Sequence, residues 1–178
     1  MIIPPTFAEA GSFHNGLSLV VHHGKVGFID HKGEFAIPPR FERGSDFHEE
    51  LAAVSLGGKS GFVDLAGKFA IPPQFDWADE FHEGLAAVRV SSAGAGAWGY
   101  VDTKGAVAIS PRFKSATGFS QGLAAVQLDQ KWGYIDTLGK IALPARFDRA
   151  KPFKDGLAFA QHQEQAGYID KTGRWVWK

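Results

Sequence analysis

The residues best suited to chemistry recur at one position of a repeated motif. Each copy reads Gly, an aromatic residue, Ile or Val, and then Asp, and the aspartates are Asp30, Asp64, Asp102, Asp136 and Asp170. Five carboxylates at one phase of a repeat array could line a channel and bind cations. We expect a structural role instead. An aspartate at a turn accepts hydrogen bonds from nearby backbone N–H groups, and the glycine three residues later accepts positive φ.

A catalytic site is not expected. Catalytic carboxylates need different environments that push their pKa values apart, whereas equivalent positions in repeats share one environment. The sequence contains no Ser-His-Asp, HExxH, Walker or dinucleotide-binding motif. A strand is expected to follow the glycine-containing segment 91–97, so this segment lacks the helix start of a phosphate-binding loop. We therefore expect neither enzyme activity nor a cofactor.

Three histidines also share a phase, because His14, His48 and His82 each directly follow a phenylalanine. Imidazoles on adjacent repeats could converge on one metal ion. We expect stacked repeats to hold equivalent side chains too far apart for this, which makes surface loops the better interpretation and predicts no metal site.

Four residues are candidates for binding a partner. Arg40, Arg112 and Arg146 share the slot before a phenylalanine and could recognise carboxylates or phosphates. The alternative is that they solvate loops and pair within the protein. Trp77 occupies a slot that holds arginine or serine in other copies, so the repeat core does not require an aromatic residue there. It could be an exposed anchor for a partner or could fold over neighbouring phenylalanines.

Composition excludes several classes of function. The 19 basic residues balance 19 acidic ones, and a neutral chain has no charge surplus for gripping nucleic acid. The absence of cysteine removes disulfides, thiol catalysis and iron–sulfur ligation. No secretory signal and no apolar run of membrane-spanning length is present, so we expect a cytoplasmic protein that does not bind membranes.

The motif marks an internal repeat with steps of 34, 38, 34 and 34 residues. After each Asp come a glycine and an apolar triplet, and after the first four there follow one or two prolines and two phenylalanines six residues apart. Residues 27–166 hold four complete repeats, and the half repeats 1–26 and 167–178 complete a fifth within a single domain 1–178.

The segment Lys131-Trp132-Gly133-Tyr134-Ile135-Asp136 resembles the WG-repeat, or KWG-repeat, family of bacterial proteins, and Trp98-Gly99-Tyr100 is a second match. The resemblance covers essentially the whole chain. Three copies depart from it by carrying Val26, Ser60 or Ala166 in place of tryptophan. The family implies a β-rich repeat array without defined chemistry. We expect Trp98 and Trp132 to have a packing role.

Within one repeat, residues 123–128 alternate like a strand, 132–136 return as a hairpin, and 140–143 form a third strand that the prolines end. The loop 146–156 is expected to be irregular or to contain one helical turn, with its phenylalanines over the core. The sequence thus predicts an all-β fold of five three-stranded units that must stack on one another.

The sequence begins and ends at the same position within the repeat, because Ile3 and Trp177 both correspond to Ile37. This favours a closed, propeller-like ring in which residues 1–5 pair near residues 174–178, since closure leaves no unpaired sheet edge. The alternative is an open β-solenoid.

The function expected from these features is a non-enzymatic scaffold that acts as a monomer and binds a protein or peptide. A module for a small ligand or glycan is the first alternative. A symmetric fold without an evolved ligand is the second.

Overall fold

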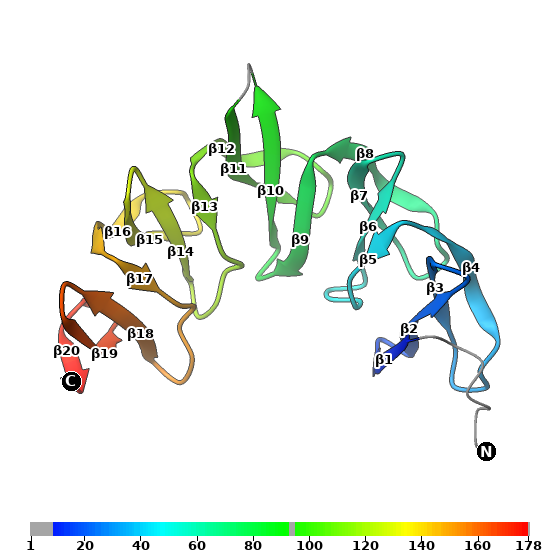
Figure 1. The fold of residues 1–178 in the computed structure, drawn as a ribbon, viewed down its shortest axis with the longest axis horizontal. Coiled ribbons are helices and arrows are strands. Elements are labelled where there is room, and N and C mark those ends of the chain that lie inside the picture. Colours follow the sequence, from blue (N-terminus) through cyan, green and yellow to red (C-terminus); the bar gives the residue numbers. More distant parts are fainter. Residues whose placement is uncertain (1–8, 93–94, 178) are drawn as a thin grey trace. The chain divides into compact units, whose positions relative to one another are not determined.

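The computed structural model describes residues 9–92 and 95–177, and this part of the chain is all-β, as predicted. It contains twenty strands in five antiparallel sheets of four strands each (Figure 1). The first sheet contains β1 (Glu9–His14), β2 (Leu17–His22), β3 (Lys25–Ile29) and β4 (Phe35–Phe41), and the second contains β5 (Arg43–Gly44), β6 (Ala52–Leu56), β7 (Lys59–Val63) and β8 (Phe69–Phe75). The third contains β9 (Trp77–His82), β10 (Leu85–Ser92), β11 (Ala95–Asp102) and β12 (Val107–Phe113). The fourth contains β13 (Ser115–Ala116), β14 (Leu123–Leu128), β15 (Lys131–Asp136) and β16 (Ile141–Phe147), and the fifth contains β17 (Arg149–Ala150), β18 (Leu157–His162), β19 (Gln165–Asp170) and β20 (Trp175–Trp177).

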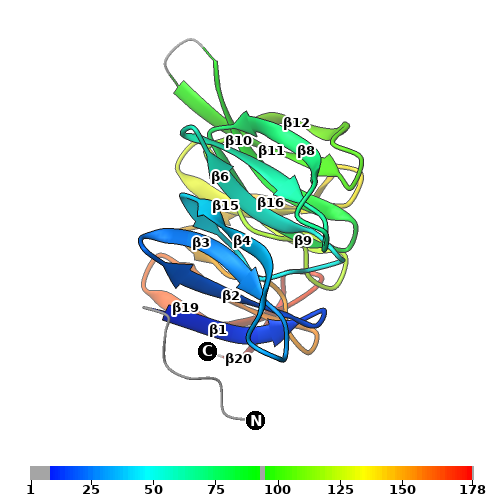
Figure 2. The same cartoon turned by 90° about the vertical axis from the view of Figure 1, so that its right-hand side faces the viewer.

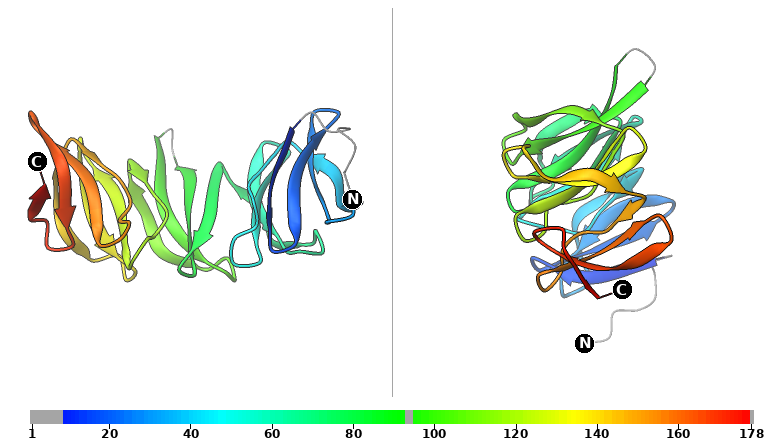
Figure 3. Two further views of the ribbon diagram at one scale, coloured as in Figure 1. Left: turned by 90° about the horizontal axis from the view of Figure 1, so that it is seen from below. Right: turned by 90° about the vertical axis from the view of Figure 1, so that its left-hand side faces the viewer.

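The chain divides into two compact units, Met1–Phe81 and His82–Lys178. Unit 1 contains β1–β8 and unit 2 contains β10–β20, while β9 crosses the boundary. Every sheet keeps its strands in chain order, as Figure 2 shows for β1–β4 and Figure 3 for the last sheet in orange and red. Over residues 9–92 and 95–177, no helix has the length and hydropathy that a membrane crossing requires.

The prediction of three strands per unit is wrong, because each sheet has four. The additional strand lies in the loop after the prolines, which was expected to be irregular. In three of the sheets it is only two residues long. In the second sheet, Arg43 lies opposite Ser55 and Gly44 opposite Val54. A pair of residues shows no alternation of apolar and polar side chains, so periodicity did not reveal it.

The prolines do not end the preceding strand, which is a second correction. β4 runs through Pro38 and Pro39, and it forms the edge of its sheet, where a missing N–H removes no ladder hydrogen bond. The β3–β4 register shifts at this point. A Cβ atom on Gly27 would lie 2.7 Å from the Ile37 carbonyl oxygen and from the Pro39 nitrogen. The bulged strand therefore explains the first glycine of the motif, because no side chain fits beneath it.

The core forms between consecutive sheets and is built from aromatic pairs. The motif aromatic of one repeat packs against the second phenylalanine of the following loop, with ring centroids 4.6–4.9 Å apart. The pairs are Phe28–Phe47, Phe62–Phe81, Tyr100–Phe119 and Tyr134–Phe153. Two of the motif tyrosines donate a hydrogen bond to the backbone: Tyr100 to the Thr117 carbonyl at 2.8 Å and Tyr134 to that of Lys151 at 2.9 Å.

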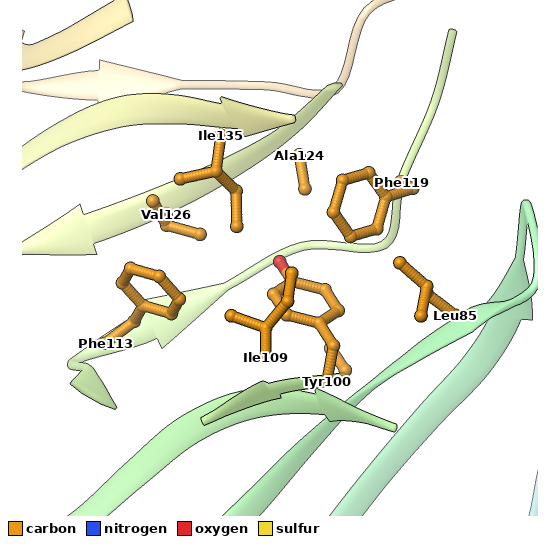
Figure 4. Close-up of a cluster of buried hydrophobic side chains, with 9 residues drawn as sticks. Leu85, Tyr100, Ile109, Phe113, Phe119, Ala124, Val126 and Ile135 are labelled. Carbon is orange, nitrogen blue, oxygen red and sulfur yellow. The ribbon is translucent and has the colours of Figure 1, made fainter. Parts of the chain in front are cut away.

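Figure 4 shows one of these interfaces in unit 2. Tyr100 and Ile109 from the third sheet point toward Ala124, Val126 and Ile135 from the fourth. All five are at least 96% buried. Within unit 2, the third and fourth sheets thus bury a face against each other, as expected for a repeat array.

The predicted pairing of the two termini falls on Met1–Pro5, which lies outside the described residues. The described strands form no closed sheet.

Candidate functional site

The five recurrent aspartates hold turns. In every copy, Oδ1 accepts hydrogen bonds of 2.8–3.1 Å from the backbone N–H groups two and four residues ahead. The N–H groups of Glu34 and Lys32 hold the pKa of Asp30 below its ordinary value of 3.8. For Asp170, the Thr172 hydroxyl and the Arg174 N–H lower the pKa in the same direction. These carboxylates are therefore engaged within their own repeats.

The three arginines at the shared slot join one repeat to the next. The Nη2 atom of Arg112 donates to the carbonyl of Gly139 at 2.8 Å, and that of Arg146 donates to Gly173 at 2.7 Å. Arg40 donates to Gly67 in the same way. Each guanidinium also lies about 5 Å from the ring centroid of the phenylalanine that follows it. One donor atom of each guanidinium, Nη2, thus serves the glycine-containing turn of the following repeat.

Trp98 and Trp132 pack on the sides of the core. Trp98 is half-buried against the cluster shown in Figure 4, and Trp132 is half-buried against the equivalent cluster of the next interface. In the β11–β12 and β15–β16 ladders, they face Phe113 and Phe147. Their indoles therefore fill space beside a buried phenylalanine.

Trp77 lies at the surface, with 43% of its area exposed. The guanidinium of Arg43 stacks over the ring at 4.5 Å from the centroid. Arg43 occupies in its own repeat the slot that Trp77 occupies in the next, so equivalent positions of two repeats meet here. The pair presents a flat aromatic and cationic surface, which suits stacking interactions with a ligand.

A cavity of about 400 Å³ lies beside this pair, entirely within unit 1. Val26, Val54 and Ala78 form apolar walls, and Ser60 lies beside Ser55. The serine hydroxyls are 3.0 Å apart and hydrogen-bonded to each other, and both side chains are buried. The cavity therefore combines apolar walls with one polar point, as ligand pockets commonly do.

The sequence reasoning singled out Trp77 but not the cavity. Two of the residues that line the cavity, Val26 and Ser60, occupy the position that tryptophan holds in the motif. That departure was visible in the sequence. Its consequence for packing became clear only when the structure placed both positions beside Trp77.

The cavity also contains acidic groups at its rim. Glu42 accepts hydrogen bonds from the N–H groups of Gly57 and Gly58, at 3.1 and 3.0 Å. Asp79 accepts one from the N–H of Glu80 at 3.1 Å. The two carboxylates accompany one guanidinium, so the rim carries a net negative charge.

A second cavity, of about 890 Å³, lies in unit 2 beside the last sheet. Phe159 and Tyr168 line it, and Tyr168 is 42% exposed although its counterparts Tyr100 and Tyr134 are completely buried. In the other copies, the phenylalanine of a following loop covers the motif aromatic.

His14 and His48 lie side by side in unit 1. The ring centroids of His14 and His48 are 5.5 Å apart. Nε2 of His14 lies 3.5 Å from Asp46, and Nε2 of His48 lies 3.3 Å from Glu80. The histidines therefore pair with carboxylates of the following repeat.

Comparison with protein families identifies the repeat. The model described as "WG containing repeat" matches residues 1–25, 27–59, 61–92, 98–132 and 132–164. No curated protein matches the sequence.

Two solved structures share the fold at low identity. A eukaryotic initiation factor is 12% identical with a TM-score of 0.53, and the match covers 88% of this chain and 48% of that one. A quinonprotein alcohol dehydrogenase-like protein from Bacteroides thetaiotaomicron is 9% identical with a TM-score of 0.52, and the match covers 95% of this chain and 54% of that one. The chain thus spans about half the length of either protein, and this likeness concerns the fold alone.

Proposed function

Because the chain belongs to the family of proteins with WG-containing repeats, whose repeat model matches it five times, we propose that it is a non-enzymatic scaffold that binds a protein or peptide. The observation that carries the proposal is the exposed Trp77–Arg43 stack beside the cavity of unit 1. Tryptophan and arginine are the residues most often found at the energetic centre of protein interfaces.

The distribution of polar contacts supports the same proposal. The recurrent aspartates and the arginines of the shared slot are engaged in turns and repeat-to-repeat hydrogen bonds. Trp77 differs from them because the repeat does not need it, since Arg43, Ser115 and Arg149 take its slot in other copies. A side chain that differs between copies and remains exposed is a candidate for a role outside the fold.

A peptide-display selection tests the proposed function. Peptides are selected on the wild-type protein and then compared on Trp77→Ala and on Leu138→Ala, a control that truncates another exposed apolar side chain. We expect peptides that bind the wild type and Leu138→Ala but bind Trp77→Ala at least tenfold more weakly, because truncation of an interface tryptophan commonly costs about 2 kcal/mol or more. Equal binding to both variants would refute the assignment.

A small-ligand or glycan module is the second candidate, and the cavity of about 400 Å³ favours it, because ligand pockets occupy roughly 300–1,000 Å³. A panel of metabolites and glycans in a melting assay would support it through a shift that Trp77→Ala removes.

We also propose that the array is a closed ring rather than an open solenoid. Phe13 is 39% exposed and Tyr168 is 42% exposed, although the equivalent Phe47 and Tyr134 are buried. In repeat register, Phe13 is the phenylalanine that follows Tyr168. The sequence contains no cysteine, so Phe13→Cys with Tyr168→Cys provides a single possible disulfide. A ring predicts a cross-linked monomer, whereas an open array predicts no cross-link or one between chains.

A further inference from the structure

The cavity of unit 1 lies beside two positions at which two of the repeats of unit 2 carry a tryptophan. Val26 faces Phe41 and Ser60 faces Phe75, just as Trp98 faces Phe113 and Trp132 faces Phe147. The four positions are therefore equivalent in strand register as well as in sequence. Of the three positions that lack the indole, Val26 and Ser60 line the cavity, whereas Ala166 lies outside it.

The cross-strand neighbours of these positions are small as well. Ser60 lies opposite Ser55, whereas Trp98 lies opposite Arg89 and Trp132 opposite Gln127. Two hydroxymethyl groups thus stand where the other repeats hold an indole beside a long polar side chain. The indole and the long polar side chain that fill this space in unit 2 have no counterpart in unit 1, where the cavity lies.

The chemistry of the cavity matches an indole. Val26, Val54 and Ala78 offer apolar walls, and the exposed ring of Trp77 offers a stacking surface at the rim. The hydrogen bond between Ser55 and Ser60 uses one hydroxyl hydrogen, which leaves oxygen lone pairs that can accept a bond from an indole N–H. A buried indole usually needs such a partner.

We propose that this cavity binds the indole of a tryptophan side chain supplied by a partner peptide. The inference rests on the proposed scaffold function and names the chemistry that the partner must carry. The bound indole takes the place, in unit 1, of the indoles that Trp98 and Trp132 supply in unit 2. Because Glu42 and Asp79 outnumber Arg43 at the rim, a peptide with basic residues beside its tryptophan fits better than one with acidic residues.

The test uses N-acetyl-L-tryptophanamide as the probe, titrated into the full-length protein and followed by amide NMR. We expect saturable shifts at residues 54–60 and 77–79, and no comparable shifts with N-acetyl-L-leucinamide. Ser60→Trp places the chain's own indole in the cavity and should weaken probe binding at least tenfold. Ala166→Trp adds an indole at the equivalent position of the last repeat, outside the cavity, and should leave binding unchanged.

Two outcomes would overturn the proposal: wild-type protein that shows no saturable shifts, or Ser60→Trp that is folded and still binds as tightly as the wild type. If Ser60→Trp does not fold, Ala78→Leu narrows the same cavity and must give the same loss. Failure of this inference is distinct from failure of the scaffold function. Selected peptides that need Trp77 but contain no tryptophan and do not compete with the probe would remove the inference alone.

Discussion

Trp132→Ser gives the fourth sheet the residue that Ser60 supplies at the equivalent position of the second sheet, while Gln127 stays opposite it. Trp132 is half-buried beside Phe147, which is completely buried. Truncating a fully buried tryptophan costs about 3–5 kcal/mol, so a half-buried one should cost about 2–3 kcal/mol. For a chain of this length, each kcal/mol lowers the melting temperature by about 2–4 °C. We therefore expect the melting temperature to fall by about 4–12 °C.

Added indole should reverse part of this loss if the new cavity matches the natural one. A ligand at ten times its dissociation constant stabilises the folded state by about 1.4 kcal/mol. Differential scanning calorimetry with and without indole measures both effects, and Leu138→Ser serves as a control that changes an exposed residue. The wild type has its own cavity, so the rescue is read as the excess over the wild-type shift.

Two results would refute this reasoning. A loss below about 0.5 kcal/mol, which is the usual range for surface substitutions, would mean that Trp132 does not fill space in the core. A full loss without any excess rescue by indole would mean that removing the tryptophan does not create an indole-binding cavity. In that case the correspondence between Ser60 and Trp132 would hold for the strand register but not for the chemistry.

Two further predictions concern the repeat signature. Gly133→Ala should destabilise unit 2 by about 2 kcal/mol or more, since its Cβ atom would lie 2.6 Å from the Leu143 carbonyl oxygen; Gly122→Asn, at a positive φ with open space around it, should cost much less in the same urea titration. Because the pKa of Asp170 is lowered in the folded state, its carboxylate stabilises the fold at pH values above the ordinary pKa of 3.8. This contribution is lost as the pH falls through the lower pKa of the folded state, so Asp170→Asn should make stability fall less steeply with decreasing pH. An unchanged dependence on acid pH would contradict the turn role.

The repeat phase could be predicted from the sequence because it rests on residues with strict backbone demands. The glycine after each Asp-containing turn adopts positive φ, and Asp30 and its counterparts bond two N–H groups each. These backbone requirements restrict the residue type at the same positions of every copy, so the repeat can be recognised in the sequence. The paired strands 123–128 and 132–136 followed from alternation for the same reason.

The fourth strand could not be predicted because its pairing is set by tertiary structure. Arg149 and Ala150 pair with Gln161 and Ala160, yet two residues carry no period. Pro38 and Pro39 were misleading because a proline ends a central strand but is tolerated at a sheet edge, and the sequence does not say which strand is the edge. In both cases the position of the segment in the sheet, and not the preference of its residues for a local conformation, determined the structure.

The candidate site follows from differences between copies rather than from the repeat itself. A repeated residue meets the same demand five times, and Asp30 and Arg40 exemplify residues that the array uses for turns and for contacts between repeats. Ser60 stands at a position where two other copies, Trp98 and Trp132, pack an indole, and Trp77 adds an indole at a position where the array does not need one. Both exceptions border the same cavity. Two independent departures from the repeat are expected to coincide only where something other than the fold constrains them, so partner binding is best sought at this cavity in unit 1.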